Sequence, residues 1–349
     1  MGMDASAHWQ EQVRAALADG TCLNVQGSAS KARLGHPVQG RMLDTREHRG
    51  IVSYDPAELV ITARAGTPLA EVEAVLAEKG QMLPCEPPHL GPGATLGGAV
   101  ASGLSGPRRP WAGALRDFVL GVRVIGGQGQ HLRFGGQVMK NVAGYDLSRL
   151  MVGSFGCLGV ITEVSLKVLP RPRASRSLCL PMPLTEALAR LAEWGQQPLP
   201  LSAASHDGQA LYLRLEGGEG SVREACQRLG GAPLRTLFWV ELNEQRLGFF
   251  NAGPPLWRLS LPPNTGVLEL PGEQWVDWAG AQRWLKTDAP GEHVHALAAR
   301  AGGHATAWHT GPALAFAPLP PALLQLHRRL KAALDPQRVF NPGRLYSEI

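Results

Sequence analysis

The sequence lacks several features that would assign it to a familiar class of protein. Its 349 residues include five cysteines, and no two of them have the C-x-x-C spacing of a zinc or iron–sulfur motif. No uncharged apolar segment is long enough to span a bilayer, and the first residues lack the basic segment and apolar run of a signal peptide. We therefore expect free thiols in a reducing cytoplasm, with no metal site and no membrane span in this chain.

The common catalytic and phosphate-binding motifs are absent too. The chain contains no G-x-x-x-x-G-K-[ST], H-E-x-x-H or G-x-S-x-G sequence. Gly91, Gly93 and Gly97 approach the G-x-G-x-x-G pattern of Rossmann folds, but the spacing is wrong and a proline-rich loop precedes them instead of a strand.

The net charge of the chain is +5, without a long basic run. This favours a solvated basic surface over a nucleic-acid-binding tail, and a partner with an acidic surface is the alternative.

Glycine-rich segments without many charges are what the chain does contain. Residues 90–103 read LGPGATLGGAVASG, residues 26–31 read QGSASK, and residues 153–162 read GSFGCLGVIT. Glycine lacks Cβ and tolerates positive φ, so the backbone N–H groups of such segments can approach a bulky anionic ligand closely. We interpret the three segments as a cradle for one large cofactor.

Hydrophobic periodicity predicts α+β structure in both halves of the chain. In the first half it predicts a helix over residues 5–17, strands over 59–65 and 158–169, and a hairpin over 118–134. In the second half the expected elements are helices at 184–194, 221–229, 292–301 and 319–334, and strands near 211–215, 256–261, 266–270 and 283–287. The aromatic pairs Phe238-Trp239 and Phe249-Phe250 suit core packing better than an exposed interface patch.

Four motifs in order resemble one family of flavoproteins. Residues 26–31 and 94–103 resemble the first two pyrophosphate loops of the vanillyl-alcohol-oxidase/PCMH-type FAD-binding family, and residues 140–162 resemble its third signature. Residues 335–345, which contain Asp-Pro and Asn-Pro-Gly, are similar to the family's C-terminal return to the flavin. The cofactor that the resemblance implies is FAD.

The resemblance also implies a domain organisation. A PCMH-type FAD-binding domain of two α+β subdomains would occupy residues 1–170, a smaller α+β cap domain residues 171–334, and a C-terminal segment that returns to the flavin residues 335–349. The sequence Pro-Arg-Pro-Arg at 170–173 marks the first boundary. Within the family, residues 54–69 look most like the FAD-binding E subunits of bacterial glycolate oxidases.

The family's cofactor contacts can be carried over to matching positions. The implied FAD-binding residues are Gly27, Ser28, Ala29, Ser30, Lys31, Gly93, Ala94, Thr95, Gly97, Gly98, Ser102, Gly103, Gly159, Val160, Ile161 and Asn341. Backbone N–H groups would hold the diphosphate, and the hydroxyls of Thr95 and Ser102 would donate hydrogen bonds. Val160 and Ile161 would bracket the adenosine end of the cofactor from a strand edge. Asn341 would lie near the isoalloxazine.

The resemblance further implies that FAD is bound non-covalently. Some relatives attach FAD through a histidine or cysteine, whereas the first loop has serine and alanine at those positions. Cys85, His89 and Cys157 are candidates by proximity only, and we interpret them as bystanders.

No catalytic residue and no metal ligand can be assigned. Relatives that oxidise 2-hydroxy acids have an arginine for the carboxylate and a histidine cluster with an E-H-G segment in the cap. Residues 292–295 read EHVH, with Val294 in place of the glycine, and His304 and His309 are equally unconvincing. Phe155 stands where relatives often have glutamate.

Three functional hypotheses follow. The first is an FAD-binding electron-transfer or accessory subunit of a glycolate oxidase complex, with a homologous catalytic flavin subunit and an iron–sulfur subunit as partners and glycolate or D-lactate as the substrate of the complex. The second is a self-sufficient FAD-dependent D-2-hydroxy-acid dehydrogenase, with Arg344, Tyr145 or His309 near the substrate. The third is a scaffold that FAD only stabilises. The first hypothesis implies a cytoplasmic protein that reaches the inner membrane only through its complex.

Overall fold

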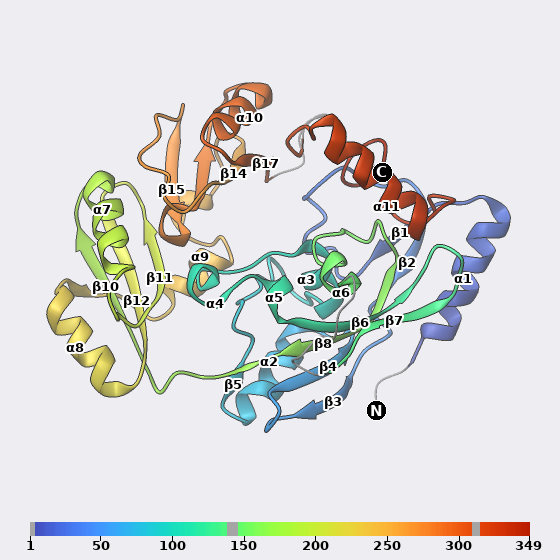
Figure 1. Ribbon diagram of the computed structural model, residues 1–349, viewed down its shortest axis with the longest axis horizontal. Helices are drawn as coiled ribbons and strands as arrows, with labels where there is room; N and C mark the ends of the chain where they lie inside the picture. The colour runs from blue at the N-terminus through green and yellow to red at the C-terminus, as the bar shows by residue number, and fades with distance from the viewer. Residues whose placement is uncertain (1–3, 138–145, 309–314) are drawn as a thin grey trace. The chain divides into compact units, whose positions relative to one another are not determined.

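The computed structural model describes residues 4–137, 146–308 and 315–349, and these fall into two compact units (Figure 1). The first unit comprises Met1–Ser105, Ala114–Pro170 and Pro318–Ile349, and the second comprises Gly106–Gly113 and Arg171–Ala317. No helix among the described residues is both long and apolar enough to cross a bilayer.

The first unit is built on a five-stranded antiparallel sheet. In spatial order its strands are β3 (Ile51–Asp55), β4 (Val60–Arg64), β8 (Val160–Lys167), β6 (Val119–Ile125) and β7 (His131–Gly135). The strands expected near 59–65 and 158–169 and the hairpin over 118–134 are thereby confirmed. Since β8 pairs with a strand on each side, it is the central strand, and both of its faces are largely buried.

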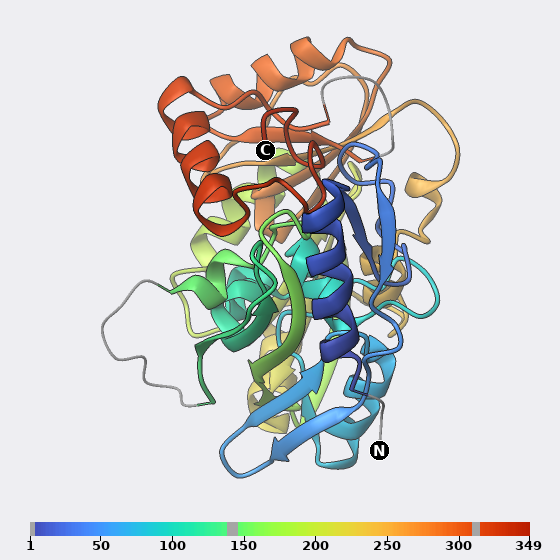
Figure 2. The same ribbon diagram turned by 90° about the vertical axis from the view of Figure 1, so that its right-hand side faces the viewer.

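Helices and a short antiparallel ladder add to the first unit. Its helices are α1 (Ser6–Asp19), α2 (Leu69–Glu78), α3 (Leu96–Ser102), α5 (Leu115–Phe118), α6 (Leu147–Leu150) and α11 (Pro321–Leu334), and β5 (Gln81–Met82) pairs with β9 (Leu169–Pro170). The expected amphipathic helix near the N-terminus is confirmed, since α1 buries Trp9, Val13 and Ala16 against residues of β6 and β8 (Figure 2).

The two ends of the chain meet at strand β1 (Leu23–Gln26). One neighbour of β1 is the parallel strand β2 (Arg41–Asp44), and the other is the C-terminal segment, through a parallel bridge between Leu23 and Phe340. Leu23 N–H donates to the Val339 carbonyl at 2.7 Å, and Asn341 N–H donates to the Leu23 carbonyl at 3.0 Å. The last residues of the chain are thus part of the first unit's core, where Phe340 is fully buried.

The second unit is an eight-stranded antiparallel sheet with helices. In spatial order the strands are β13 (Ala232–Pro233), β10 (Ala174–Pro181), β12 (Ala210–Gly217), β11 (Leu201–His206), β15 (Glu273–Asp277), β16 (Gln282–Lys286), β14 (Leu256–Ser260) and β17 (His304–Ala307). Its helices are α4 (Arg109–Ala112), α7 (Leu184–Trp194), α8 (Glu219–Leu229), α9 (Phe238–Asn243) and α10 (Gly291–Arg300), with 3₁₀ turns η1 (Gly248–Phe250) and η2 (Trp278–Gly280).

Buried aromatic side chains form much of the second unit's interior. Phe238, Trp239 and Phe249 are buried, so the core interpretation of these aromatic pairs is supported. Phe238 and Phe249 pack on Trp275 at ring-centroid distances of 6.3 and 5.7 Å. The strand expected over 266–270 is wrong, because the strand in this part of the chain is β15, after that segment.

The division into units differs from the expected domain limits at two places. The change from one unit to the other between Pro170 and Arg171 coincides with the expected boundary. Helix α11, however, groups with the first unit instead of the cap, and Gly106–Gly113 groups with the second unit. The second assignment has a physical basis, since Trp278 Nε1 donates to the Gly106 carbonyl at 3.0 Å and the Arg109 guanidinium lies 4.3 Å from the Trp278 ring centroid.

His48 makes the stability of the first unit dependent on pH. Its ring is buried beside Trp9, its Nδ1 accepts a hydrogen bond from Ala5 N–H at 3.0 Å, and burial lowers its pKa to about 4. The unfolded chain binds a proton on this ring near pH 6.5, whereas the folded chain does so only near pH 4. Stability is therefore fully present above pH 6.5 and declines as the pH falls through this window, by up to about 3 kcal/mol.

We expect this decline to be missing in the His48→Gln variant. Urea unfolding of the wild type and the variant at pH 7.0, 5.5 and 4.5 measures it, because the difference between the two chains removes the contribution of the other titrating groups. An equal decline in both chains would contradict the assignment to His48.

Candidate functional site

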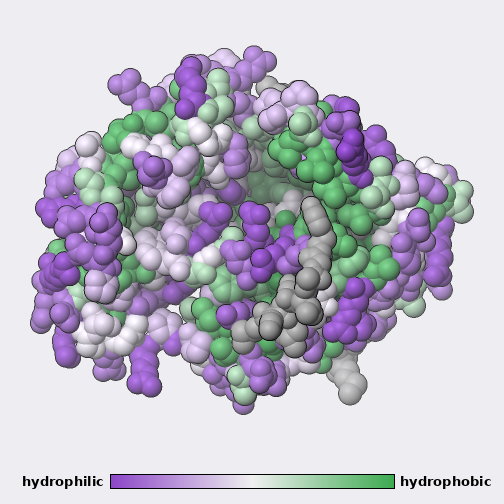
Figure 3. All heavy atoms as spheres, in the orientation of Figure 1, coloured by the Kyte–Doolittle hydropathy of each residue, from purple (hydrophilic) through white to green (hydrophobic). Residues whose placement is uncertain are grey.

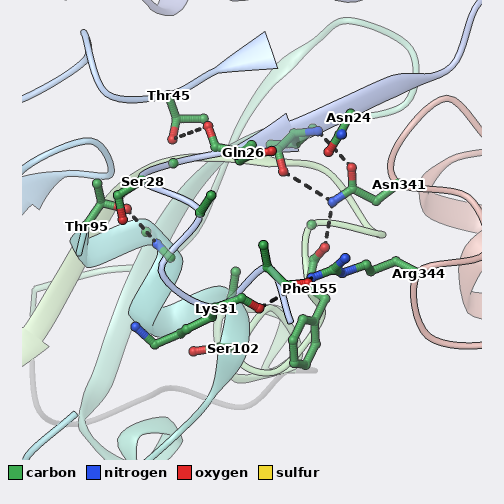
Figure 4. Close-up of a pocket in the computed structure, with 18 of the residues that line it drawn as sticks. Asn24, Gln26, Ser28, Lys31, Thr45, Thr95, Ser102, Phe155, Asn341 and Arg344 are labelled. Carbon is green, nitrogen blue, oxygen red and sulfur yellow. Dashed lines mark hydrogen bonds between the residues drawn. The ribbon is translucent and has the colours of Figure 1, made fainter. Parts of the chain in front are cut away.

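A cavity of about 320 Å³ opens in the first unit, beside β1, α3 and the C-terminal segment (Figure 4). Every residue that lines it belongs to the first unit. Twelve of the sixteen residues expected to bind the cofactor line this cavity: Gly27, Ser28, Ala29, Ser30, Lys31, Thr95, Gly97, Gly98, Ser102, Gly159, Ile161 and Asn341. The fold therefore brings together four segments that are far apart in the sequence.

The loop that follows β1 presents backbone donors at the cavity. Among the described residues, the N–H groups of Gly27, Ser28, Ala29 and Ser30 have no hydrogen-bond acceptor. The loop is a turn closed by Ala32 N–H to the Ala29 carbonyl at 2.9 Å, and Ala29 has φ = 59°, in the left-handed region. Successive N–H groups in a turn that includes a left-handed residue form an anion-binding concavity, or nest.

Two basic side chains line the cavity, and no carboxylate among the described residues does. Lys31 Nζ donates to the His89 carbonyl at 3.0 Å. The Arg344 guanidinium donates to the carbonyls of His36 at 2.8 Å and Ala32 at 3.0 Å, and burial lowers its pKa. An arginine in a protein nevertheless stays protonated at neutral pH. The described lining is therefore cationic and suits a ligand with a negatively charged group.

The segment expected to be the second glycine loop is in part a helix. Helix α3 covers Leu96–Ser102, and the hydroxyl of Thr95 caps it by accepting a hydrogen bond from Gly98 N–H at 3.2 Å. Ser102 Oγ donates to the Ala99 carbonyl at 3.0 Å. Both hydroxyls expected to donate to the ligand thus make hydrogen bonds within this helix.

Gly97 has a packing role in addition to its place at the cavity. A Cβ at this position would lie 2.7 Å from Ala65 Cβ and 3.0 Å from the Ala65 carbonyl oxygen, so the absence of a side chain lets α3 approach the end of β4. The ideal Cβ points at Ala65, so a larger side chain at this position would first disturb the packing of α3 on β4.

Asn341 joins the C-terminal segment to two other walls of the cavity. Its Nδ2 donates to the Phe155 carbonyl at 2.7 Å and to the Val25 carbonyl at 3.4 Å, while its Oδ1 accepts from Val25 N–H at 2.7 Å. Figure 4 shows these bonds as dashed lines. Its φ of 39° is in the left-handed region, which asparagine tolerates better than most residues. Asn341 lines the cavity as expected, but its amide is engaged in holding the cavity together.

Four expected cofactor-binding residues do not line the cavity. Ala94 and Val160 are buried, Gly103 ends α3 with φ = 65°, and Gly93 lies in the loop before α3. Val160 was expected on a strand edge; it begins the central strand β8 and pairs there with Ile125 of β6, while the pairing of β8 with β4 starts only at Glu163. Of the pair expected to bracket the adenosine, only Ile161 reaches the cavity.

Several lining residues were not expected. They are Asn24, Val25, Gln26, Ala32, Pro37, Val38, Thr45, Ala65, Ala101, Phe155, Gly156 and, except as a possible substrate contact, Arg344. Apart from Arg344, four of them lie inside the quoted motifs, three border the first motif, and four lie outside the four motifs: inside are Gln26, Ala101, Phe155 and Gly156, at the border Asn24, Val25 and Ala32, and outside Pro37, Val38, Thr45 and Ala65. For Arg344 the only signal was its position after Asn-Pro-Gly. Two sets of expected residues lie outside the described residues: residues 140–145 of the third signature, which include Tyr145, and His309.

None of the side chains considered for a covalent link is part of the cavity lining. Cys85 and Cys157 are buried, and burial raises the pKa of each thiol, to about 11 for Cys157. A buried protonated thiol is a poor nucleophile. His89 Nε2 lies 3.1 Å from the Glu73 carboxylate. No cysteine or histidine is among the described residues that line the cavity.

The cap histidines do not form a site in the described part of the chain. Residues 292–295 lie at the start of α10, where Val294 and His295 are buried, and His304 begins β17. No group of three metal-binding side chains occurs among the described residues.

Comparison with known proteins agrees with the cavity's chemistry. A family model described as an FAD binding domain matches residues 4–135. The chain is 59% identical to the glycolate oxidase subunit GlcE of Escherichia coli strain K12 over 346 residues, which cover 99% of each chain. It is 34% identical to the glycolate oxidase subunit GlcD of Bacillus subtilis strain 168 over 143 residues, 41% of this chain and 30% of that protein.

A solved structure shares the fold. The structure of an alkyldihydroxyacetonephosphate synthase superposes with a TM-score of 0.67, covering 96% of this chain and 75% of that one at 15% identity. This likeness concerns the fold alone.

Proposed function

Because the chain belongs to the family of the glycolate oxidase subunit GlcE, whose members are FAD-dependent oxidoreductases, we propose that it is the FAD-binding subunit of a glycolate oxidase assembly. The membership confirms the resemblance that the glycine-rich motifs indicated. We further propose that the subunit has an electron-transfer or accessory role in the oxidation of glycolate to glyoxylate.

The observation that carries the proposal is the set of four free N–H groups of residues 27–30 beside Lys31 and Arg344. A diphosphate needs hydrogen-bond donors and positive charge, and this corner of the cavity offers both without an opposing carboxylate among the described residues. These residues would hold the diphosphate of FAD. Bound FAD would supply the redox chemistry, taking electrons from one partner and passing them to another.

We propose that FAD is held without a covalent bond. The described lining offers neither a cysteine nor a histidine, and the nearby thiols of Cys85 and Cys157 have raised pKa values. Denaturation in acid or urea followed by filtration should release all of the flavin into the filtrate.

The accessory role is supported by the composition of the cavity lining. Oxidation of a 2-hydroxy acid needs a group that takes the hydroxyl proton, for which histidine and carboxylates are the usual bases. The described lining has neither, since its only ionisable side chains are Lys31 and Arg344. The base would then come from a homologous flavin subunit, and an iron–sulfur subunit would accept the electrons, because this chain has no paired cysteines of its own. We place the subunit in the cytoplasm, at the inner membrane only through that assembly.

Anaerobic mixing of the FAD-loaded chain with glycolate and with D-lactate tests the role. We expect the flavin's long-wavelength absorbance to persist with the chain alone and to bleach once the homologous flavin subunit and the iron–sulfur subunit are added. Prompt bleaching by either acid without partners would mean a self-sufficient dehydrogenase. A flavin that dithionite bleaches, but that the complete assembly with substrate does not, would mean a scaffold.

A further inference from the structure

Helix α11 exposes a row of apolar side chains. Leu323 and Leu326 are 40% and 48% exposed, Ala333 is exposed and Leu330 is half-buried. Their spacing of three and four residues places them on one face of the helix, and we call these four residues the leucine stripe. Figure 3 shows hydrophobic surface over this helix. The only buried residue of the helix is a lysine, so packing within the chain accounts for little of this apolar face.

The charges on α11 are all of one sign. Its sequence, PALLQLHRRLKAAL, has no acidic residue, and Arg328 and Arg329 are exposed. Arg328 lies 3.5 Å from Glu348, and Arg329 borders the leucine stripe in the helical arrangement of the residues. The complementary surface is therefore an apolar groove with carboxylates along its edge.

The same helix is tied to the cavity. Lys331, on another face of α11, donates through Nζ to the carbonyls of Cys157 and Phe340, each at 2.7 Å. Phe340 precedes Asn341, which lines the cavity. A protein that docks on the leucine stripe would thus sit about one helix diameter, roughly 10 Å, from the segment that supports the cofactor site.

We propose that the leucine stripe of α11 docks into a carboxylate-edged apolar groove on a partner subunit of the assembly. This inference rests on the proposed function, which supplies the partner. A membrane suits the helix less well, because interfacial helices often have Trp or Phe on the apolar face, whereas α11 has neither, and one of its two exposed arginines lies 3.5 Å from Glu348. A second copy of the chain suits it less well too, because a two-fold contact would bring identical basic edges together.

Co-purification tests the proposal on the full-length chain, produced together with its partner subunits, one of which carries an affinity tag. Leu326→Glu is expected to lower the amount of chain retained at least tenfold, and Leu323→Glu/Leu326→Glu to abolish retention. Arg329→Glu should lower it severalfold. Leu237→Glu is the matched control, since Leu237 is 61% exposed in the second unit, and it should be retained like the wild type. All variants should keep wild-type flavin content, which shows that they fold.

Full retention of the double leucine variant would overturn the proposal. A wild-type chain that forms a dimer alone, and that Leu326→Glu converts to a monomer, would assign the stripe to a second copy instead. Leu326-dependent binding to vesicles containing anionic lipid would assign it to the membrane. A wild-type chain that is retained by no subunit would contradict the proposed function itself, whereas retention of both wild type and variant contradicts only the docking surface.

Discussion

We expect the Lys331→Met variant to lose about 3–5 kcal/mol of folding free energy, the cost of leaving one member of a buried ion pair without its partner. Lys331 Nζ lies 2.8 Å from Asp335 Oδ2, and the two side chains are 3% and 0% exposed. An exposed pair at the same spacing would contribute less than about 1 kcal/mol. The expected loss is larger here because the pair is buried: methionine would leave the Asp335 carboxylate in the interior with no cation.

The loss extends beyond the ion pair to the C-terminal segment. The Asp335 carboxylate also accepts the N–H groups of Val339 at 2.9 Å and Phe340 at 2.8 Å, and Lys331 donates to the Phe340 carbonyl. The pair therefore fixes the segment that places Asn341 at the cavity. We expect the variant to bind FAD more weakly as well as to unfold at lower urea concentration.

Urea unfolding followed by circular dichroism measures the free energy, and Arg329→Met serves as the control. Arg329 is an exposed basic residue on the same helix, so its replacement should change the stability of the isolated chain by no more than about 0.5 kcal/mol. Asp335→Asn and the double variant complete a cycle, in which the coupling between the two positions should exceed about 1 kcal/mol. Equal effects of Lys331→Met and Arg329→Met would contradict the buried pair.

The hydrophobic pattern of the sequence was sufficient to predict most of the helices and strands. Helix α7 begins and ends where its apolar spacing predicts, and the hairpin of β6 and β7 surrounds its expected turn. The α+β class and the FAD-binding domain are confirmed by the sheet topology and the family match. These features depend on residues close together in the chain, where periodicity is informative.

Tertiary packing overrode local propensity in the second glycine segment. Gly97 and Gly98 each disfavour a helix by about 1 kcal/mol relative to alanine, so the sequence predicts a loop. The structure forms α3 there because Gly97 allows close contact with Ala65, and Thr95 supplies a cap.

The strand predicted over residues 266–270 failed for a different reason. Val267 is half exposed and outside any strand, because an apolar segment forms a strand only where a neighbouring strand is available to pair.

The residues that form the walls of the cavity could not be predicted from the spacing of motifs in the sequence. Asn341 bonds to residues 316 and 186 positions away, and Arg344 bonds to His36 across 308 positions. Motifs identify residues that approach the ligand, whereas such long-range hydrogen bonds identify the residues that hold those motifs in place. The placement of Gly106–Gly113 in the second unit has the same origin, in the contacts of Trp278.

The second large effect is expected at Ala29, whose left-handed backbone shapes the loop of free N–H groups. A β-branched side chain is strained by roughly 1–2 kcal/mol at its φ of 59°, whereas glycine adopts this conformation freely. We therefore expect Ala29→Val to weaken FAD binding at least tenfold and Ala29→Gly to bind FAD as tightly as the wild type or more tightly. Ala29 is exposed, so neither change disturbs core packing.

Titration of flavin fluorescence measures the dissociation constant, and ADP serves as a second probe that has the diphosphate but no flavin ring. If residues 27–30 hold the diphosphate, Ala29→Val should weaken ADP and FAD by the same factor. Ala279→Val is the matched control, because Ala279 has φ = 53° in the second unit, away from the cavity lining. It should impose the same strain and leave both affinities unchanged. Valine at φ = 59° would distort the loop that presents the free N–H groups. Wild-type affinity of Ala29→Val for both FAD and ADP would therefore mean that the diphosphate is held elsewhere.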